Sequence, residues 1–188
     1  EMPAHPVSPY GASKLAGERA IQEVNDLHLI FRTSWVYGPH GKNFLLTMLR
    51  LAAERDQLSI VNDQGVGPTT PIELADATRT VVEGALAGRF GPAQDWVGLY
   101  HLTCGGSTSW FGFAQAIFSR AAERLHIKAP AITPIDTKEY PTPAKRPHNS
   151  VLSNQKLNER LGVRLAHWEK ALDAVFDSIE SANHQPPQ

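Results

Sequence analysis

A tyrosine and a lysine stand four residues apart near the start of the chain, at Tyr10 and Lys14. Residues with this spacing lie on one face of a helix, so a phenol and an ammonium can face the same ligand. A free phenol has a pKa of about 10, and a neighbouring ammonium favours the phenolate. The pair therefore suits acid–base catalysis between a carbonyl and an alcohol, although an exposed helix face without a catalytic role has the same pattern.

The elements around this pair can be predicted from caps and apolar spacing. Ser8 followed by Pro9 is a typical helix start, and we expect a helix over 9–25 with an apolar stripe. The apolar run 27–34 predicts a buried parallel strand, and 35–42 predicts a loop. Asn43 is expected to cap the next helix, over 44–55.

Strands continue to alternate with helices along the rest of the chain, which favours an α/β fold with a parallel sheet. The expected strands are 58–61, 99–103 and 132–135, and the expected helices are 72–86, 109–125, 155–161 (ended by Gly162) and 167–179. The proline-rich stretch 141–147 is expected to be an extended loop. These strands are too few for a complete doubly wound sheet.

Composition excludes several classes of protein. The 188 residues carry 18 Lys and Arg against 19 Asp and Glu, which provides no basic footprint for nucleic acid. One cysteine, Cys104, allows no internal disulfide, and the eight histidines show no metal-ligand spacing. No apolar run approaches the ~20 residues that span a bilayer. We therefore expect a soluble, cytoplasmic protein without a metal site or a membrane partner.

An ordered set of segments across the chain resembles the extended short-chain dehydrogenase/reductase superfamily, and within it the dTDP-4-dehydrorhamnose reductases. The segments are SPYGASKLAGE at 8–18, RTSWVYG at 32–38, GKNF at 41–44, TMLRLA at 47–52, DQGVGPT at 63–69, YHL at 100–102 and RPHNSVL at 146–152. The resemblance implies reduction of the C4 keto group of dTDP-4-dehydro-6-deoxy-L-mannose by hydride from NADPH or NADH, in dTDP-rhamnose biosynthesis.

The resemblance also implies roles for individual residues. Tyr10 would protonate the C4 oxygen, and Lys14 would bind the nicotinamide ribose and lower the phenol pKa. The indole of Trp35 would form an apolar wall and a ring donor in the active site, rather than belong to the core. Thr33 and Ser34 end a strand where open α/β sheets bind ligands, so they approach the nicotinamide or are structural.

Two further residues are candidates for binding the sugar nucleotide. Arg146 lies in a loop with the right chemistry for a diphosphate, since guanidinium matches phosphate oxygens, although a solvated loop arginine is the alternative. Asn43 has the reach for a ligand contact as well as for capping its helix. Gln64, Thr69 and Cys104 are expected to be structural.

The chain lacks one part of such an enzyme. No G-x-G-x-x-G motif occurs in the 188 residues, and the first residue is Glu1 rather than Met. We therefore expect an inactive C-terminal fragment. Residues 1–37 would end the dinucleotide-binding, Rossmann-like domain, and 38–182 would form a smaller α/β substrate-binding domain. Within it, 99–103 would return to the Rossmann sheet, and 183–188 would be a disordered tail.

Partners and alternative functions follow from the same resemblance. A homodimer is expected, and some members of the family use Mg²⁺ at a dimer contact, which this sequence does not locate. Another sugar-nucleotide epimerase or dehydratase shares the tyrosine–lysine pair. A non-catalytic regulatory subunit like that of methionine adenosyltransferase is the third hypothesis, which Trp35 disfavours.

Overall fold

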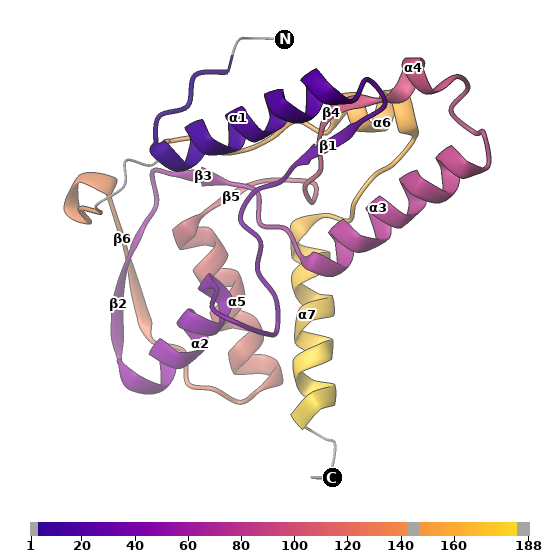
Figure 1. Ribbon diagram of the computed structural model, residues 1–188. Helices are drawn as coiled ribbons and strands as arrows, with labels where there is room; N and C mark the ends of the chain where they lie inside the picture. The colour runs from indigo at the N-terminus through magenta and orange to yellow at the C-terminus, as the bar shows by residue number, and fades with distance from the viewer. Residues whose placement is uncertain (1–3, 143–146, 184–188) are drawn as a thin grey trace.

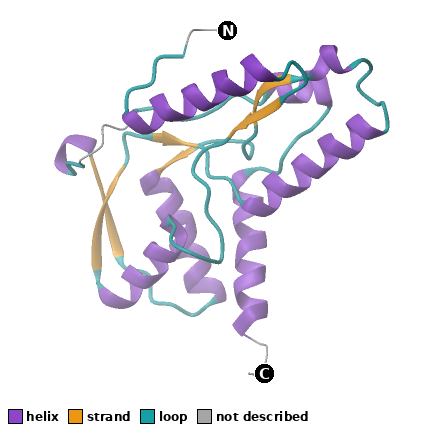
Figure 2. Cartoon of the chain, viewed as in Figure 1, coloured by secondary structure: helices purple, strands orange, loops and turns teal. Residues whose placement is uncertain are grey.

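A computed structural model of the chain describes residues 4–142 and 147–183. Helices dominate it, with short strands between them (Figures 1 and 2). The α/β class predicted from the sequence is confirmed. In chain order the elements are α1 (Pro9–Val24), β1 (Leu29–Arg32), α2 (Phe44–Glu54), β2 (Gln57–Val61), β3 (Gly65–Val66), α3 (Pro71–Leu86), α4 (Ala93–Trp96), β4 (Gly98–His101), β5 (Thr108–Ser109), α5 (Trp110–Arg124), β6 (Ala131–Ile135), the 3₁₀ turn η1 (Thr137–Glu139), α6 (Gln155–Leu161) and α7 (Trp168–Asn183).

The strands pair two by two. β1 lies parallel to β4, with Leu29 opposite Gly98, and β2 lies parallel to β6, with Gln57 opposite Ala131. β3 and β5 form a two-residue antiparallel pair, which the sequence does not predict. Both longer pairs join segments far apart in the chain, as parallel pairing requires.

One core surrounds α5. This helix buries one side made of aromatic, aliphatic and small residues, namely Trp110, Phe113, Ala114, Ile117, Phe118 and Ala121. Residues of α2, β2 and α7 join it, including Leu45, Ile60 and Phe176. The period of about 3.6 residues in α5 and α7 dictates this arrangement, because each helix has a wide apolar stripe that only a neighbour can cover.

A second core lies under α3. Ala77 and Val81 of this helix pack with Tyr100, with Leu102 just after β4, and with Leu157 of α6. Figure 1 shows the resulting division, with α1, β1, β4, α3 and α6 above and α2, α5, α7, β2 and β6 below.

Thr69 ties together segments that pass between the two cores. It is fully buried, its carbonyl accepts the Tyr37 N–H at 3.0 Å, and its N–H donates to the Trp35 carbonyl at 3.2 Å. Its hydroxyl donates to the Gly67 carbonyl and accepts the Cys104 N–H. The structural role expected for Thr69 is therefore confirmed.

Two predicted helix starts and one predicted stop are confirmed. The Ser8 hydroxyl accepts the Gly11 N–H at 3.1 Å, and the Asn43 side chain accepts the Leu46 N–H at 3.1 Å. Gly162 ends α6 with φ of 63°, a backbone conformation that glycine adopts without strain. Residues 143–146 of the predicted proline-rich loop and 184–188 of the predicted tail lie outside the described residues.

Helix α1 differs from its expectation in one respect. Its apolar stripe is not buried: no residue of α1 is buried, and Val24 is 84% exposed. A strand of four residues is about 13 Å long, whereas a helix of 16 residues is about 24 Å long, so β1 and β4 cannot cover α1. A salt bridge between Glu18 and Arg32 of β1 anchors the helix, with two N···O distances of 2.7 and 2.5 Å.

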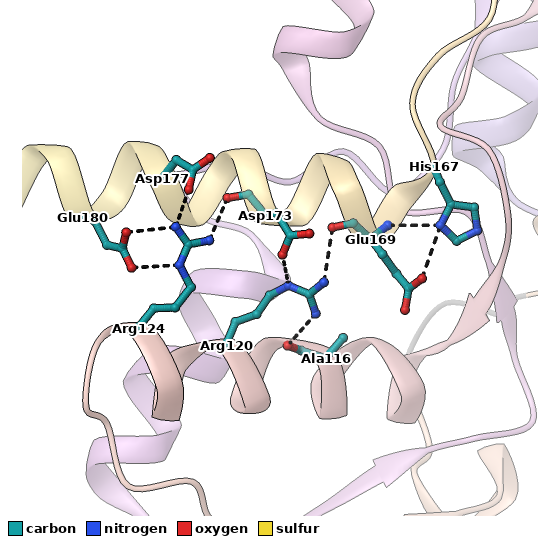
Figure 3. A network of polar contacts seen from close by, with 8 residues as sticks. All are labelled: Ala116, Arg120, Arg124, His167, Glu169, Asp173, Asp177 and Glu180. Atoms are coloured by element: carbon teal, nitrogen blue, oxygen red, sulfur yellow. Dashed lines mark hydrogen bonds and ion pairs between the residues drawn. The ribbon is translucent and has the colours of Figure 1, made fainter.

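Ion pairs join α5 to α7 (Figure 3). Arg120 Nε donates to Asp173 Oδ1 at 2.5 Å. Arg124 pairs with both oxygens of Glu180, at 2.8 and 2.9 Å, and also contacts Asp177. Both arginine side chains are about four-fifths shielded from solvent. Each guanidinium thus makes several hydrogen bonds, and such a contact is stronger than an isolated surface pair.

Within the described ranges, no helix combines the length and the apolar composition that crossing a membrane requires.

We predict that Arg124→Met lowers the free energy of unfolding by about 1 kcal/mol, because it leaves Glu180 and Asp177 without their shared cation. Chemical denaturation at low and high salt measures the change, which salt should reduce. Arg79→Met is the matched control, since the Arg79 side chain is 63% exposed in its pair with Glu83. An equal loss in both variants would contradict a special contribution from the α5–α7 contacts.

Candidate active site

Tyr10 and Lys14 lie together on α1. Ser8 caps the helix and Pro9 occupies its first position, so Tyr10 stands in the first turn with 71% of its surface exposed. The Lys14 ammonium lies over the phenol, 5.6 Å from the ring centroid. Free N–H groups in the first turn favour an anion there. The structure thus places a phenol beside a cation, and both side chains are open to a ligand.

Trp35 adopts an unusual backbone conformation directly after β1. Its φ is 51°, in the left-handed region that bulky residues avoid at a cost of about 1–2 kcal/mol. Hydrogen bonds of the neighbouring backbone with Thr69 hold this conformation. Such strain persists only where surrounding contacts determine it, and it concentrates at functional sites.

The Trp35 ring joins an aromatic cluster. It lies edge-on against Trp110, and Trp110 also contacts Phe44, with ring centroids 4.5 Å apart. The Trp110 N–H donates to Gln64 Oε1 at 3.1 Å, and Gln64 Nε2 donates to the Thr137 hydroxyl at 3.0 Å. Gln64 is buried, so its expected structural role is confirmed.

The indole N–H of Trp35 is also engaged. It donates to the Ser150 hydroxyl at 2.7 Å. While this bond is present, Trp35 offers a ligand its ring rather than the ring donor that the sequence interpretation included.

A cavity of about 860 Å³ lies beside this cluster. It runs along one face of α2 and the strand β2, and it is also bordered by Gln64, Trp110 and Tyr140. Arg55 and Glu139 supply charged groups, and Phe44 and Met48 supply apolar surface. Its size lies within the range of about 300–1,000 Å³ that small-molecule sites occupy. The mixture of aromatic, amide and guanidinium groups suits a nucleotide.

The remaining predicted site residues are distributed as follows. Thr33 is exposed after β1, and the Ser34 hydroxyl donates to the Gly67 carbonyl at 3.1 Å. The Asn43 side chain caps α2, and its amide donates to the carbonyls of Gly38 and His40. Arg146 lies outside the described residues. The contacts thus form one group at Tyr10 and Lys14 and a second around Trp35.

Sequence reasoning assigned no role to Trp110 or Ser150. Each meets Trp35 across more than 70 residues of chain, and no local pattern marks such a contact. The segment around Ser150 belongs to the motifs quoted above, but the motif alone does not say what the serine touches. Cys104 is buried, which raises the pKa of its thiol to about 11, so it is a poor nucleophile at neutral pH.

Among residues 4–142 and 147–183, no three or more His, Cys, Asp or Glu side chains are grouped so that they could hold a metal ion.

Comparison with known proteins shows which family this chain resembles. A family model described as the RmlD substrate binding domain matches residues 1–181. A dTDP-4-dehydrorhamnose reductase from Burkholderia thailandensis is 47% identical over 173 residues, which cover 90% of this chain and 58% of that protein. A similar protein with the same name from Escherichia coli K12 is 41% identical over 175 residues, covering 93% of this chain and 57% of the relative.

A solved structure shows the same likeness. The dTDP-4-dehydrorhamnose reductase from Bacillus anthracis, in complex with NADP, has a TM-score of 0.82 at 34% identity. The match covers 94% of this chain and 58% of that one. The chain therefore spans somewhat more than half the length of the relatives it matches.

We predict that Asn43→Ala lowers the free energy of unfolding by about 1 kcal/mol, because α2 loses its cap. Asn43→Ser keeps a capping oxygen and should recover most of this loss, which thermal or chemical denaturation measures. Stability that is unchanged in Asn43→Ala would contradict the capping role.

Proposed function

Because the chain belongs to the RmlD substrate binding domain family, we propose that it carries the active-site helix and sugar-nucleotide domain of a dTDP-4-dehydrorhamnose reductase. The proposed reaction reduces the C4 keto group of dTDP-4-dehydro-6-deoxy-L-mannose to the alcohol of dTDP-L-rhamnose. The observation that carries the proposal is the exposed Tyr10 phenol with the Lys14 ammonium over its ring. The shared name of relatives more than 40% identical favours a reductase over an epimerase, a dehydratase or a non-catalytic subunit.

Tyr10 is the proton donor in this proposal. Reduction of a ketone leaves negative charge on its oxygen, and the phenol hydroxyl neutralises that charge by donating its proton. A tyrosine in an exposed first turn can approach the ketone without rearrangement of the helix. A positioned acid of this kind contributes about 10²–10⁴-fold to the rate.

Lys14 has two roles in this proposal. Its ammonium stabilises the phenolate that remains on Tyr10, and its N–H groups suit the hydroxyls of a nicotinamide ribose. Thr33 and Ser34, which follow β1, are proposed to border the same nucleotide. Lys14 and Thr33 are exposed and Ser34 is half-buried. Each carries a hydrogen-bond donor of a kind that suits the hydroxyls and phosphates of a nucleotide. When it is bound, the reduced nicotinamide supplies the hydride.

The sugar nucleotide is proposed to lie in the cavity between α2 and β2, with its sugar toward Trp35. Trp110 and Phe44 offer aromatic surface at the Trp35 end of the cavity, and Arg55, after the last residue of α2, offers a cation for the diphosphate toward the other end. Arg146 is proposed as a second diphosphate contact, and Asn43 as a contact from the start of α2. Residues 1–37 then belong to a dinucleotide-binding domain and 38–182 mainly to the substrate domain. The pairing of β4 with β1 supports the return of 99–103 to the first domain.

To test the reaction, this chain replaces the matched segment of the Burkholderia thailandensis reductase, and NADPH oxidation is followed with the dTDP-keto-sugar. We predict that the chimera turns over and that Tyr10→Phe lowers kcat about 10²–10⁴-fold with little change in substrate affinity, because only a proton donor is lost. Lys14→Met should lower kcat and also weaken NADPH binding. A folded chimera without activity, or Tyr10→Phe with more than about a tenth of the original kcat, would contradict the proposal.

A homodimer in the cytoplasm is proposed for this chain, with α1 at its contact. The exposed apolar residues Ile21, Val24 and Leu27 support this choice, because such patches are commonly covered by a partner. We predict that the chain sediments as a dimer and that Val24→Lys shifts it toward the monomer, whereas Leu86→Lys on α3, where Leu86 is 85% exposed, does not. A monomer at micromolar concentration would contradict the proposal.

A further inference from the structure

A chain of hydrogen bonds leads away from the Trp35 indole. The indole N–H donates to the Ser150 hydroxyl at 2.7 Å, and this hydroxyl donates to the Gly65 carbonyl at 2.9 Å. The three residues come from the loop after β1, from β3 and from the segment before α6. Ser150 uses its hydroxyl proton on Gly65 and a lone pair on Trp35, so the geometry fixes the direction of both bonds.

Ser150 is itself held in place. Its N–H donates to the Gly65 carbonyl at 2.9 Å, and the Gly65 N–H donates to the His148 carbonyl at 2.7 Å. The Asn149 side chain passes close to Gly65, where a Cβ atom would meet Asn149 Oδ1 at 3.3 Å. Segment 147–151 is therefore fastened along β3, and the Ser150 hydroxyl has little freedom to follow a moving indole.

Trp35 needs such a restraint more than most residues. Its φ is 51°, a backbone conformation that tryptophan rarely adopts, and this conformation sets the direction in which the side chain leaves the backbone. Trp110 contacts the ring of Trp35, and the Ser150 hydroxyl holds its indole N–H. The hydrogen bond has a defined direction, so it favours one orientation of the ring.

We propose that Ser150 is a positioning residue for substrate: by accepting the Trp35 N–H, it sets the orientation of the indole that borders the sugar. This inference rests on the proposed function, because it needs a sugar beside Trp35. It assigns Ser150 no contact with the reacting atoms. Loss of one hydrogen bond that orders the ring should weaken sugar binding about three- to tenfold and leave nucleotide binding unchanged.

The first experiment examines the hydrogen bond without any ligand. The indole N–H signals of the chain are recorded by ¹H–¹⁵N NMR after ¹⁵N labelling of tryptophan, and Trp35→Phe identifies the Trp35 signal. Ser150→Ala should move this signal, and Ser150→Thr should restore it. Ser153→Ala is the matched control, because Ser153 lies three residues after Ser150 and its hydroxyl accepts the Gln155 N–H instead of an indole N–H. A signal unmoved by Ser150→Ala would overturn the proposal.

The second experiment measures binding of dTDP and of dTDP-glucose by calorimetry. Ser150→Ala should weaken dTDP-glucose by the factor given above and leave dTDP unchanged, whereas Ser150→Thr and Ser153→Ala should change neither. In a Trp35→Phe background, Ser150→Ala should have no further effect. Equal weakening of both ligands, or of neither, overturns the positioning role alone. If the unmodified chain binds neither ligand, the proposed function fails, and the inference about substrate fails with it.

Discussion

The fully buried Thr69 holds together the part of the structure on which the site depends. Its backbone is bonded to the segment 35–37, and its hydroxyl links the Gly67 carbonyl to the Cys104 N–H. These segments pass between the core around α5 and the core under α3. A buried backbone group without a partner costs about 1–3 kcal/mol, and replacing this threonine by an apolar residue would remove the hydroxyl that accepts the Cys104 N–H. The Gly67 carbonyl would still accept the Ser34 hydroxyl, and the backbone bonds to the segment 35–37 would remain. Hydrogen bonds of one residue therefore join the segments that pass between the two cores.

Trp35 sits at this join, and its strained backbone follows from the position. β1 packs against the core under α3, whereas α2 belongs to the core around α5, so the segment between them passes from one core to the other. The hydrogen bonds with Thr69 fix where this segment crosses. The crossing directs the indole toward Trp110 and Ser150, next to the cavity between α2 and β2. The aromatic cluster is thus positioned by the packing of both cores, rather than by the loop alone.

Local features were predictable from the sequence because local chemistry determines them. Ser8, Asn43 and Gly162 mark helix ends through interactions within a few residues. The β3–β5 pair and the Trp35–Ser150 contact were not predictable, since they join segments that the sequence separates widely and two-residue strands leave no periodicity. The exposed face of α1 differs from its apolar pattern for a related reason: a stripe indicates that a surface can be buried, but it does not say which element, if any, packs on it.

We expect this chain to bind the sugar nucleotide on its own, whereas the dinucleotide needs a glycine-rich turn that the 188 residues do not contain. Calorimetric titration of the purified chain with dTDP and with NADPH tests this expectation directly. We predict saturable binding of one dTDP per chain, at least about tenfold tighter than any binding of NADPH, which corresponds to about 1.4 kcal/mol. A folded chain that gives no saturable heat with dTDP, or that binds NADPH more tightly, would contradict it.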